Sequence, residues 1–215
     1  MLRSWTLILT FAGAAGLAVA SVALAAQHAT APQPFALESA RTLGSPNAPV
    51  TMVEFSDFQC SFCRKFWAET LPRLKETYIK NGQVRFVYQH FAVLGEHSFA
   101  AGQAAECARE QERFWPYHDK LFESQGGLAF TNAKLKRYAG ESGLDVGAFA
   151  QCLDSGKYRQ KVEDETRLGL QLGARGTPTF FLNGRMLPGA QPFEVFQAAI
   201  EEALAKASTQ NLPTR

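Results

Sequence analysis

Cys60 and Cys63 are separated by Ser61 and Phe62, and they follow a strand-like run and open a helix-like one. Thiols at this spacing can form a disulfide that is made and broken reversibly. The thiolate is the attacking species in such exchange, so the reactive cysteine needs a lowered pKa and an exposed sulfur. Cys60 fits this role, because a helix start presents unpaired N–H groups and the positive end of the helix dipole. Cys63, one turn further in, is expected to be shielded and to act as the resolving thiol.

Other uses of this cysteine pair are a purely structural disulfide, half of a zinc site, or a pair of soft ligands for Cu(I). The sequence contains no second CxxC motif that could complete a zinc site. Arg64 follows the second cysteine where a c-type haem motif would have histidine. Reversible disulfide chemistry is therefore the favoured interpretation, with a Cu(I)-binding module as the alternative from another functional class.

The composition fits a folded protein that does not bind nucleic acid. The 215 residues are 46% hydrophobic and 12% aromatic, which is enough to bury a full core. Lys and Arg number 22 against 20 for Asp and Glu, and the two signs alternate along the chain instead of forming a basic stripe. A nucleic-acid partner is therefore not expected.

Residues 1–26 are predicted to be a signal peptide. Arg3 supplies a positive n-region, residues 5–22 are uncharged and apolar, and residues 23–25 provide small side chains for cleavage. The alternative is a retained anchor, since the uncharged run is long enough to span a bilayer. Both interpretations place the body of the protein in the periplasm or otherwise outside the cytoplasm, and only the anchor brings membrane contact.

Export affects how all four cysteines are interpreted, because thiols in an oxidising compartment are expected to pair. Cys60 and Cys63 pair locally, so Cys107 and Cys152 are left for each other. A bridge that closes a loop of this size stabilises a fold by about 4 kcal/mol. The alternative role for the second pair is a regulatory or second redox bond that modulates the first.

The hydrophobic pattern predicts a strand, a helix and a second strand around the first cysteine pair. Residues 50–55 are mostly apolar, as in a strand buried on both faces, and residues 84–88 resemble them. Between them, apolar residues recur every three to five positions over residues 62–78, as in an amphipathic helix with a kink at Pro72. This order implies parallel strands joined by a right-handed crossover.

The remaining sequence predicts a helical block and a C-terminal hairpin. Residues 99–166 are rich in Ala, Glu, Gln, Lys and Leu and are interrupted by glycines, which predicts several short helices. Residues 179–182 and 185–187 flank Asn183 and Gly184, a strong hairpin signal, and a closing helix follows. The expected fold class is α/β, a thioredoxin fold with an inserted helical domain.

Two motifs carry a family resemblance. Residues 54–60 read Glu-Phe-Ser-Asp-Phe-Gln-Cys and residues 176–181 read Gly-Thr-Pro-Thr-Phe-Phe. In combination, these motifs resemble the DsbA family of exported thiol:disulfide oxidoreductases, and the resemblance covers about residues 43–204. The expected divisions are a signal segment (1–26), a linker (27–42), a first thioredoxin-like part (43–95), a helical insertion (96–172), a second thioredoxin-like part (173–207) and a flexible tail (208–215).

The resemblance implies roles for three residues outside the cysteine pair. In the family, a Thr-Pro pair faces the active-site disulfide, so Thr177 and Pro178 are expected there, and a cis proline leaves the Thr177 backbone free to pair with an extended substrate. An ordinary trans proline at a strand start is the alternative. Glu54 matches the buried acid of the family and is expected to relay a proton to or from Cys63. The alternatives are that Asp57 serves in this role or that Glu54 lies on a solvated face of the strand.

The residues between the cysteines differ from the Pro-His of the best-known oxidases, so Cys60 lacks a stabilising histidine. A milder oxidant is therefore expected, and a reductase or isomerase with reversed electron flow is the alternative function. A threonine before the proline, as at Thr177, resembles the pattern in the isomerases of this superfamily. Residues 27–44 are too short, however, to supply the dimerisation domain of those isomerases. Oxidase is consequently favoured over isomerase.

The expected function is transfer of the Cys60–Cys63 disulfide to folding or reduced exported proteins. The resemblance implies reoxidation by a membrane redox partner, and no cofactor or metal is expected. Four aromatic residues are candidates for an apolar rim that contacts unfolded clients: Phe58, Phe62, Phe91 and Trp115. The four histidines lack metal-ligand spacing and are predicted to be structural: His28, His90, His97 and His118.

Overall fold

The computed structural model describes residues 39–210, which contain a five-stranded mixed sheet of order β1-β3-β2-β4-β5. The strands are β1 (Thr42–Leu43), β2 (Val50–Ser56), β3 (Val84–His90), β4 (Thr179–Leu182) and β5 (Arg185–Pro188). β2 and β3 run parallel, as predicted, and the other neighbours are antiparallel. The predicted signal peptide or anchor lies outside the described residues, as do residues 27–38 of the predicted linker.

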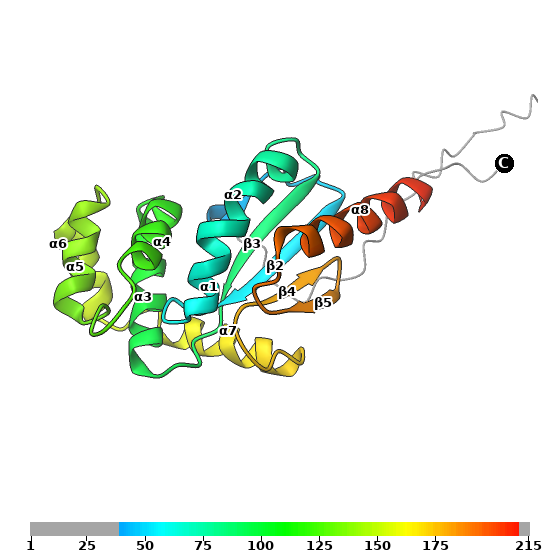
Figure 1. The fold of residues 1–215 in the computed structure, drawn as a ribbon. Helices are drawn as coiled ribbons and strands as arrows, with labels where there is room; N and C mark the ends of the chain where they lie inside the picture. Colours follow the sequence, from blue (N-terminus) through cyan, green and yellow to red (C-terminus); the bar gives the residue numbers. More distant parts are fainter. Residues whose placement is uncertain (1–38, 211–215) are drawn as a thin grey trace, which may run out of the picture. The chain divides into compact units, whose positions relative to one another are not determined.

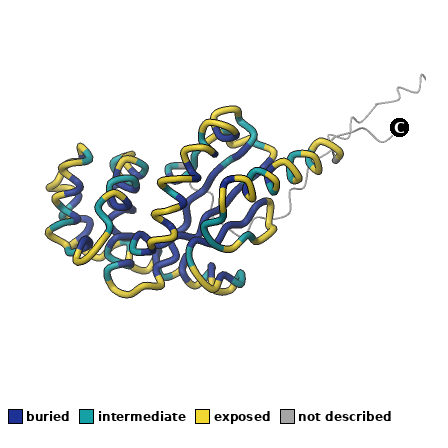
Figure 2. Tube along the Cα trace, viewed as in Figure 1, coloured by how far each residue is buried: buried dark blue, intermediate teal, exposed yellow. Residues whose placement is uncertain are grey.

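β2 is the central strand because its side chains are apolar on both faces. Val50 and Met52 belong to one buried cluster, whereas Val53 and Phe55 belong to another on the opposite face. Figure 2 shows β2 and β3 buried along nearly their whole length. A strand that is anchored on both faces holds the loop that follows it, and this loop leads to Cys60.

An uninterrupted helical run follows that loop. It consists of α1 (Ser61–Lys65), a π-helical turn (Phe66–Thr70), α2 (Leu71–Leu74) and a second π-helical turn (Lys75–Ile79). Pro72 lies in the first turn of α2, where its missing N–H is tolerated. The disturbance predicted at Pro72 therefore takes the form of a π-helical turn directly before it.

Helices cover both faces of the sheet. On one face, the ring of Phe66 lies 4.5 Å from that of Phe180, which lies 4.8 Å from that of Phe196 on α8 (Phe193–Gln210). On the other face, α7 (Arg159–Gln171) packs so closely at Gly169 that a Cβ there would lie 2.9 Å from the rings of Phe55 and Phe91. In Figure 1, α1, α2 and α8 lie on one side of the sheet and α7 lies on the other.

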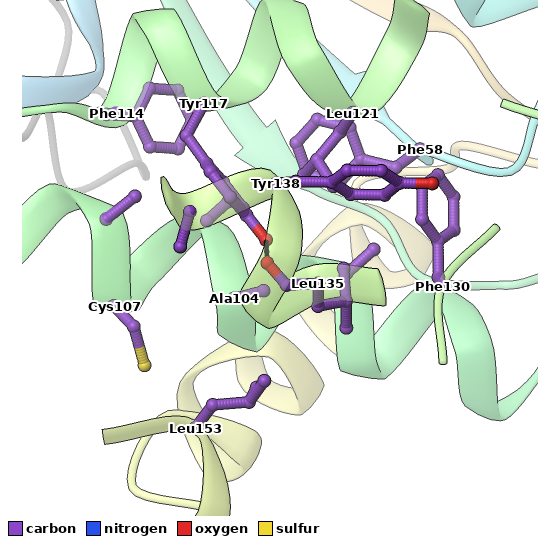
Figure 3. Close-up of a cluster of buried hydrophobic side chains, with 14 of the residues drawn as sticks. Phe58, Ala104, Cys107, Phe114, Tyr117, Leu121, Phe130, Leu135, Tyr138 and Leu153 are labelled. Atoms are coloured by element: carbon purple, nitrogen blue, oxygen red, sulfur yellow. Dashed lines mark hydrogen bonds between the residues drawn. The ribbon is translucent and has the colours of Figure 1, made fainter. Parts of the chain in front are cut away.

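The segment between β3 and β4 is helical, as predicted. It contains α3 (Glu96–Glu110), α4 (Phe114–Glu123), α5 (Asn132–Glu141), α6 (Val146–Asp154) and α7. A buried cluster of apolar side chains joins α3, α4, α5 and α6, and in Figure 3 the hydroxyl of Tyr117 points to the carbonyl of Leu135. That hydrogen bond is 2.9 Å long and connects α4 to α5.

The C-terminal hairpin has the predicted turn, with positive φ at both Asn183 (45°) and Gly184 (88°). Such φ values give the type I′ turn whose twist matches the flanking strands. The flexible tail was predicted to begin at residue 208, but α8 continues through Gln210, and the hydroxyl of Ser208 bonds to the carbonyl of Leu204 at 3.0 Å. Within residues 39–210, no helix combines the length and the apolar character that crossing a membrane requires.

The predicted linker extends too far toward the C-terminus. Residues 39–41 form a 3-10 turn and Thr42 begins β1, which pairs with β3. Arg41 is fully buried and donates two hydrogen bonds of 2.7 Å to the carboxylate of Glu165 on α7. Although burial opposes ionisation, Arg41 and His90 hold the pKa of Glu165 at about 2, so the ion pair stays charged. These residues therefore join the sheet to the helical block. No local sequence pattern predicts this contact, because Arg41 and Glu165 are 124 positions apart along the chain.

Candidate active site

Cys60 is the N-cap residue of α1, directly after the loop that leaves β2. Its backbone is extended (φ −77°, ψ 121°), and its N–H bonds to the carbonyl of Asp57 at 3.0 Å. Cys60 is 8% exposed and Cys63 is 0% exposed, and both are free thiols in this structure. The outer sulfur is thus near the surface but largely covered, whereas the inner one is sealed, as expected for a resolving thiol.

The pKa of Cys60 is lowered to about 6. The largest cause is the hydrogen bond from the Cys63 thiol; the Thr177 side chain and the backbone N–H groups of Cys63 and Phe62 add to it and together outweigh the effect of burial. In its neutral form, the Cys60 thiol lies 3.2 Å from the carbonyl oxygen of Thr177, to which it donates. At neutral pH, most Cys60 is therefore a thiolate, even without a histidine between the two cysteines.

Cys63 has the opposite environment. Burial raises its pKa well above the usual range, and its hydrogen bond to Cys60 and the charge of Glu54 raise it further. The proton shared by the pair consequently stays on Cys63. This asymmetry makes Cys60 the better nucleophile and the better leaving group.

Glu54 lies on β2 with 1% exposure, so the solvated alternative for this acid is wrong. It alternates along the strand with Val53 and Phe55 and therefore faces the α1 side of the sheet. Burial raises its pKa to about 8, and the Cys60 charge contributes in the same direction. Oε1 of Glu54 has no hydrogen-bond partner among the described residues. A buried carboxyl that is neutral at pH 7 and has an unpaired oxygen can give or take a proton.

Asp57 is also buried, but its oxygens are already used. Oδ1 accepts the N–H of Gln59 at 2.8 Å, and Oδ2 accepts those of Val93 and Leu94 at 2.9 and 3.1 Å. Asp57 therefore braces the loop before Cys60 against the loop after β3. Of the two carboxyl groups considered in the sequence analysis, Glu54 is the one available for proton transfer.

The Thr177–Pro178 peptide bond is cis, so the trans alternative is wrong. Pro178 is buried directly before β4, and its carbonyl accepts the N–H of Gly189 at 2.8 Å. Because the carbonyl of Thr177 contacts the Cys60 sulfur, this segment lies beside the reactive atom, as the family resemblance implied. The structure thus brings together five sequence-predicted site residues: Glu54, Cys60, Cys63, Thr177 and Pro178.

Only Phe62 of the four candidate rim aromatics is strongly exposed, at 62%. Phe58 and Phe91 are core residues, which corrects the expectation that they could contact clients. Exposed leucines that were not predicted from the sequence lie on the loops after β3 and α4: Leu94 (51%) and Leu128 (66%). Isolated leucines in loops carry no periodic signal, so the pattern gave no means of finding them.

Phe58 instead joins the loop before Cys60 to the helical block. Its ring stacks on Tyr88 at 5.3 Å and contacts Phe122 of α4 at 5.1 Å and His118 at 5.7 Å. Figure 3 shows Phe58 among side chains of this block. Burial lowers the pKa of His118, and its Nδ1 bonds to Asp119 at 2.9 Å, which agrees with the predicted structural role.

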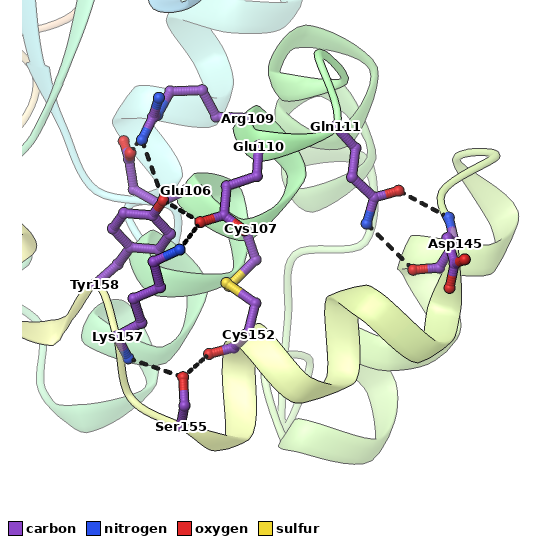
Figure 4. The surroundings of a disulfide bond; sticks show 10 residues. All are labelled: Glu106, Cys107, Arg109, Glu110, Gln111, Asp145, Cys152, Ser155, Lys157 and Tyr158. Carbon is purple, nitrogen blue, oxygen red and sulfur yellow. Dashed lines mark hydrogen bonds and ion pairs between the residues drawn. A yellow bond between two sulfur atoms is a disulfide. The ribbon is translucent and has the colours of Figure 1, made fainter.

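The Cys107–Cys152 disulfide is formed, as predicted, and it joins α3 to α6 with 5.8 Å between the Cα atoms. Figure 4 shows polar side chains packed around it. The hydroxyl of Ser155 donates to the carbonyl of Cys152 at 2.7 Å, and Lys157 and Tyr158 bond to Glu110. In the part of the chain that the structure describes, no three His, Cys, Asp or Glu side chains gather as a metal site would require.

Comparison with known proteins places this site in a family. The thioredoxin family model matches residues 37–202. The probable disulfide bond formation protein D of Bacillus anthracis is 32% identical over 186 residues, which cover 80% of this chain and 82% of that protein. The crystal structure of oxidised BdbD from Bacillus subtilis has a TM-score of 0.72 at 27% identity and covers 77% of this chain and 92% of its own. The α-DsbA1 of Wolbachia pipientis has a TM-score of 0.70 at 26% identity, with coverages of 79% and 93%.

The chain also matches a Na(+)/H(+) antiporter of Salinispora tropica, but it spans only 24% of that protein's length. The relatives that match along most of their length are named for disulfide bond formation, which leaves the Cu(I)-binding alternative without support. The cysteine pair at the start of a helix, the cis proline beside it and the buried acid beneath it occur on a matching fold. The chain belongs to the thioredoxin family and is a DsbA-like thiol:disulfide oxidoreductase.

Proposed function

We propose that the protein donates its Cys60–Cys63 disulfide to pairs of thiols in exported proteins. The observation that carries this proposal is the opposite shift of the two thiols, with the pKa of Cys60 at about 6 and the pKa of Cys63 raised. A stable Cys60 thiolate favours the reduced form of the pair, so the disulfide tends to pass to the client. A reductase would need the opposite tendency.

The reaction takes two exchange steps. A client thiolate attacks Sγ of Cys60, the Cys60–Cys63 bond breaks, and Cys63 leaves with the electron pair while a mixed disulfide forms between Cys60 and the client. The second client thiolate then attacks the client sulfur of this mixed disulfide, and Cys60 leaves as a thiolate. The client loses two electrons and gains a disulfide, while the cysteine pair gains two electrons and becomes a dithiol.

Glu54 has the properties needed to protonate Cys63 in the first step. A thiolate at a fully buried sulfur is unfavourable, so the departing Cys63 needs a proton. Burial raises the pKa of Glu54 to about 8, which keeps its carboxyl protonated at neutral pH. Once Glu54 has lost its proton, its charge raises the pKa of Cys63, so the two groups are electrostatically linked. We therefore assign Glu54 as the general acid for the departing thiol and as the base in the reverse direction.

The client chain would bind across the surface next to Cys60. Thr177 lies beside the sulfur and offers backbone groups to an extended peptide, a mode of recognition that needs no particular sequence. The exposed side chains of Phe62, Leu94 and Leu128 would contact apolar residues that an unfolded client still exposes. Such contacts favour unfolded over folded clients.

We further propose that the protein works outside the cytoplasm and is reoxidised by a membrane redox partner. The first 26 residues have the charge and hydropathy pattern of an export signal or anchor. Disulfides persist in oxidising compartments, and the Cys107–Cys152 bridge is consistent with such a location. After each cycle the Cys60–Cys63 dithiol must pass two electrons to an acceptor.

Refolding of a reduced client with several disulfides tests this function. Cys60→Ser should abolish oxidation of the client, because serine cannot form the mixed disulfide. The matched control is the double variant Cys107→Ser with Cys152→Ser, which should keep the activity under conditions where it is folded. Client oxidation that survives in Cys60→Ser, or a purified pair that reduces client disulfides instead, would overturn the proposal.

A further inference from the structure

The helical block contacts the loop before Cys60 through a side chain that the mechanism above does not use. Gln125 lies between α4 and α5, and its amide nitrogen donates to the carbonyl of Phe58 at 2.7 Å and to that of Cys60 at 3.0 Å. Both amide hydrogens are therefore directed at the main chain of the reactive cysteine's loop. Gln125 is 67 residues from Phe58 in sequence, so no local pattern links them.

The chain around Gln125 is built to present this side chain. α4 ends at Glu123 with Ser124 as its C-cap, and the N–H of Gln125 still bonds to the carbonyl of Phe122 at 3.4 Å. Gly126 and Gly127 then turn the chain away with φ values of 130° and 50°. No atom lies within 4 Å of a Cβ built at either glycine, so backbone conformation and not space explains glycine at these two positions.

The same loop is held from its other side by a second glutamine. The amide nitrogen of Gln59 donates to the carbonyl of Leu94 at 3.1 Å and to the hydroxyl of Ser98 at 2.8 Å. Residues 57–60 are thus fixed between the loop after β3 and the loop after α4. Gln125 differs from Gln59 in that one of its bonds reaches Cys60 itself.

The position of the Cys60 main chain matters for its sulfur. The backbone N–H groups of Phe62 and Cys63 help to lower the pKa of Cys60, and they can do so only while Cys60 stays at the N-cap of α1. The carbonyl of Cys60 accepts the first helical hydrogen bond, from the N–H of Arg64 at 3.1 Å, and it also accepts the bond from Gln125. Without Gln125, the carbonyls of Phe58 and Cys60 would each lose one hydrogen bond, and the loop would be free to move.

We propose that Gln125 is a positioning residue for Cys60, through which the inserted helical block holds the reactive cysteine at the first turn of α1. This inference rests on the proposed function only in taking Cys60 as the sulfur that exchanges. It gives the insertion a part in the chemistry in addition to its part in covering the sheet. Gln125 does not touch the client or the sulfur, so it acts through the Cys60 main chain.

Gln125→Met tests this proposal, because methionine has a similar length and no hydrogen-bond donor. The matched control is Gln151→Met, at an exposed glutamine on α6 in the same block. Three quantities are measured in each folded variant: the Cys60 pKa from thiolate absorbance, the equilibrium of the Cys60–Cys63 pair with glutathione, and hydrogen exchange at the Arg64 N–H.

For Gln125→Met, we expect the pKa of Cys60 to rise by about one unit. At pH 7 the glutathione equilibrium constant should shift about fivefold toward the disulfide form, equivalent to about 20 mV. Exchange at the Arg64 N–H should become faster, because the first helical hydrogen bond is less well held. Gln151→Met should match the wild type in all three quantities.

If Gln125 had only a structural role, Gln125→Met would lower the free energy of unfolding without changing the Cys60 pKa. A folded Gln125→Met with wild-type Cys60 pKa and wild-type glutathione equilibrium would overturn the proposal. If Gln125→Met does not fold, the same measurements on Gln125→Asn decide the question, since its amide falls one methylene short of the two carbonyls. The proposed function fails separately, if Cys60→Ser still oxidises clients.

Discussion

The two cysteine pairs of this protein lie at opposite ends of their helices. Cys60 is the N-cap of α1, where backbone N–H groups and the helix dipole favour an anion. Cys107 and Cys152 lie in the last turns of α3 (Glu96–Glu110) and α6 (Val146–Asp154), where the dipole disfavours an anion. The same property of the helix therefore makes the first pair a source of thiolate and the second pair a poor one.

The surroundings of the two pairs differ in the same direction. Cys60 lies against the Thr177 carbonyl at the surface, and the sulfurs of its pair are free thiols. The Cys107–Cys152 bridge joins two helices, and polar side chains of α3 and of the loop between α6 and α7 lie around it (Figure 4). Redox activity depends on the stability of the reduced form, which the start of a helix favours at Cys60 and the ends of helices disfavour at Cys107 and Cys152.

Removal of the second bridge should cause a large loss of stability. Cys107→Ser with Cys152→Ser opens a loop of 45 residues, which should lower the free energy of unfolding by about 4 kcal/mol. Urea unfolding of the oxidised proteins measures this change. Client oxidation per folded molecule should stay at the wild-type rate. A large loss of oxidation rate without loss of stability would show that the second pair is also a redox group. The two pairs would then not differ in role.

Graded reduction should separate the two pairs by roughly a hundredfold in dithiol concentration. About tenfold of this follows at pH 7 from a Cys60 pKa of about 6, because the thiolate draws the equilibrium toward the reduced form. The packing around Cys107 and Cys152 supplies the rest. Thiol labelling and mass spectrometry after equilibration would show which cysteines react. Opening of both pairs at one concentration would contradict the prediction.

Glu54→Gln should stabilise the reduced protein by about 4 kcal/mol at pH 8, and by much less at pH 4. Burial raises the folded-state pKa of Glu54 to about 8 from its ordinary value of 4.5, so its contribution to stability is fully present below pH 4.5. That contribution is lost as the pH rises from 4.5 to 8, because the unfolded chain releases the proton first. Glutamine cannot ionise and escapes this loss.

Urea unfolding at both pH values measures this effect, and Glu76→Gln on the exposed side of the helical run is the matched control. The control should show no such pH-dependent gain. Equal stability changes in Glu54→Gln at pH 4 and pH 8 would mean that folding does not raise the pKa of Glu54. The assignment of Glu54 as the proton donor for Cys63 would then fail.

The fold followed from the sequence where neighbours in the chain determine local structure. The apolar run at residues 50–55 predicted β2, and Asn183-Gly184 predicted the hairpin turn, since both signals depend on adjacent residues. The ion pair of Arg41 with Glu165 joins residues 124 positions apart, and no short window contains it. For this reason the end of the predicted linker was wrong.

The candidate site was predictable to a similar extent. Cys60, Cys63 and the Thr177-Pro178 pair stand in recognisable motifs, but the choice between Glu54 and Asp57 required the hydrogen bonds that occupy Asp57. Gln125 and Leu128 lie on a loop far from the cysteines in sequence, and neither belongs to a recognisable motif. Phe58 was a candidate for the rim because composition alone does not tell an exposed phenylalanine from a buried one.

Phe62→Ala should produce the smallest change and should locate client binding at the first pair. Phe62 is 62% exposed, and its backbone N–H, which helps to stabilise the Cys60 thiolate, remains in the variant. Loss of part of one apolar contact should raise the KM for an apolar peptide thiol about fivefold, since burial of this ring contributes on the order of 1 kcal/mol. Reaction with glutathione, which has no apolar side chain to bind, should be unchanged, as should the Cys60 pKa. An equal effect on glutathione would mean that Phe62 acts on the sulfur and not on the client. Leu128→Ala, on the loop after α4, would then show whether another exposed apolar residue contributes to client binding.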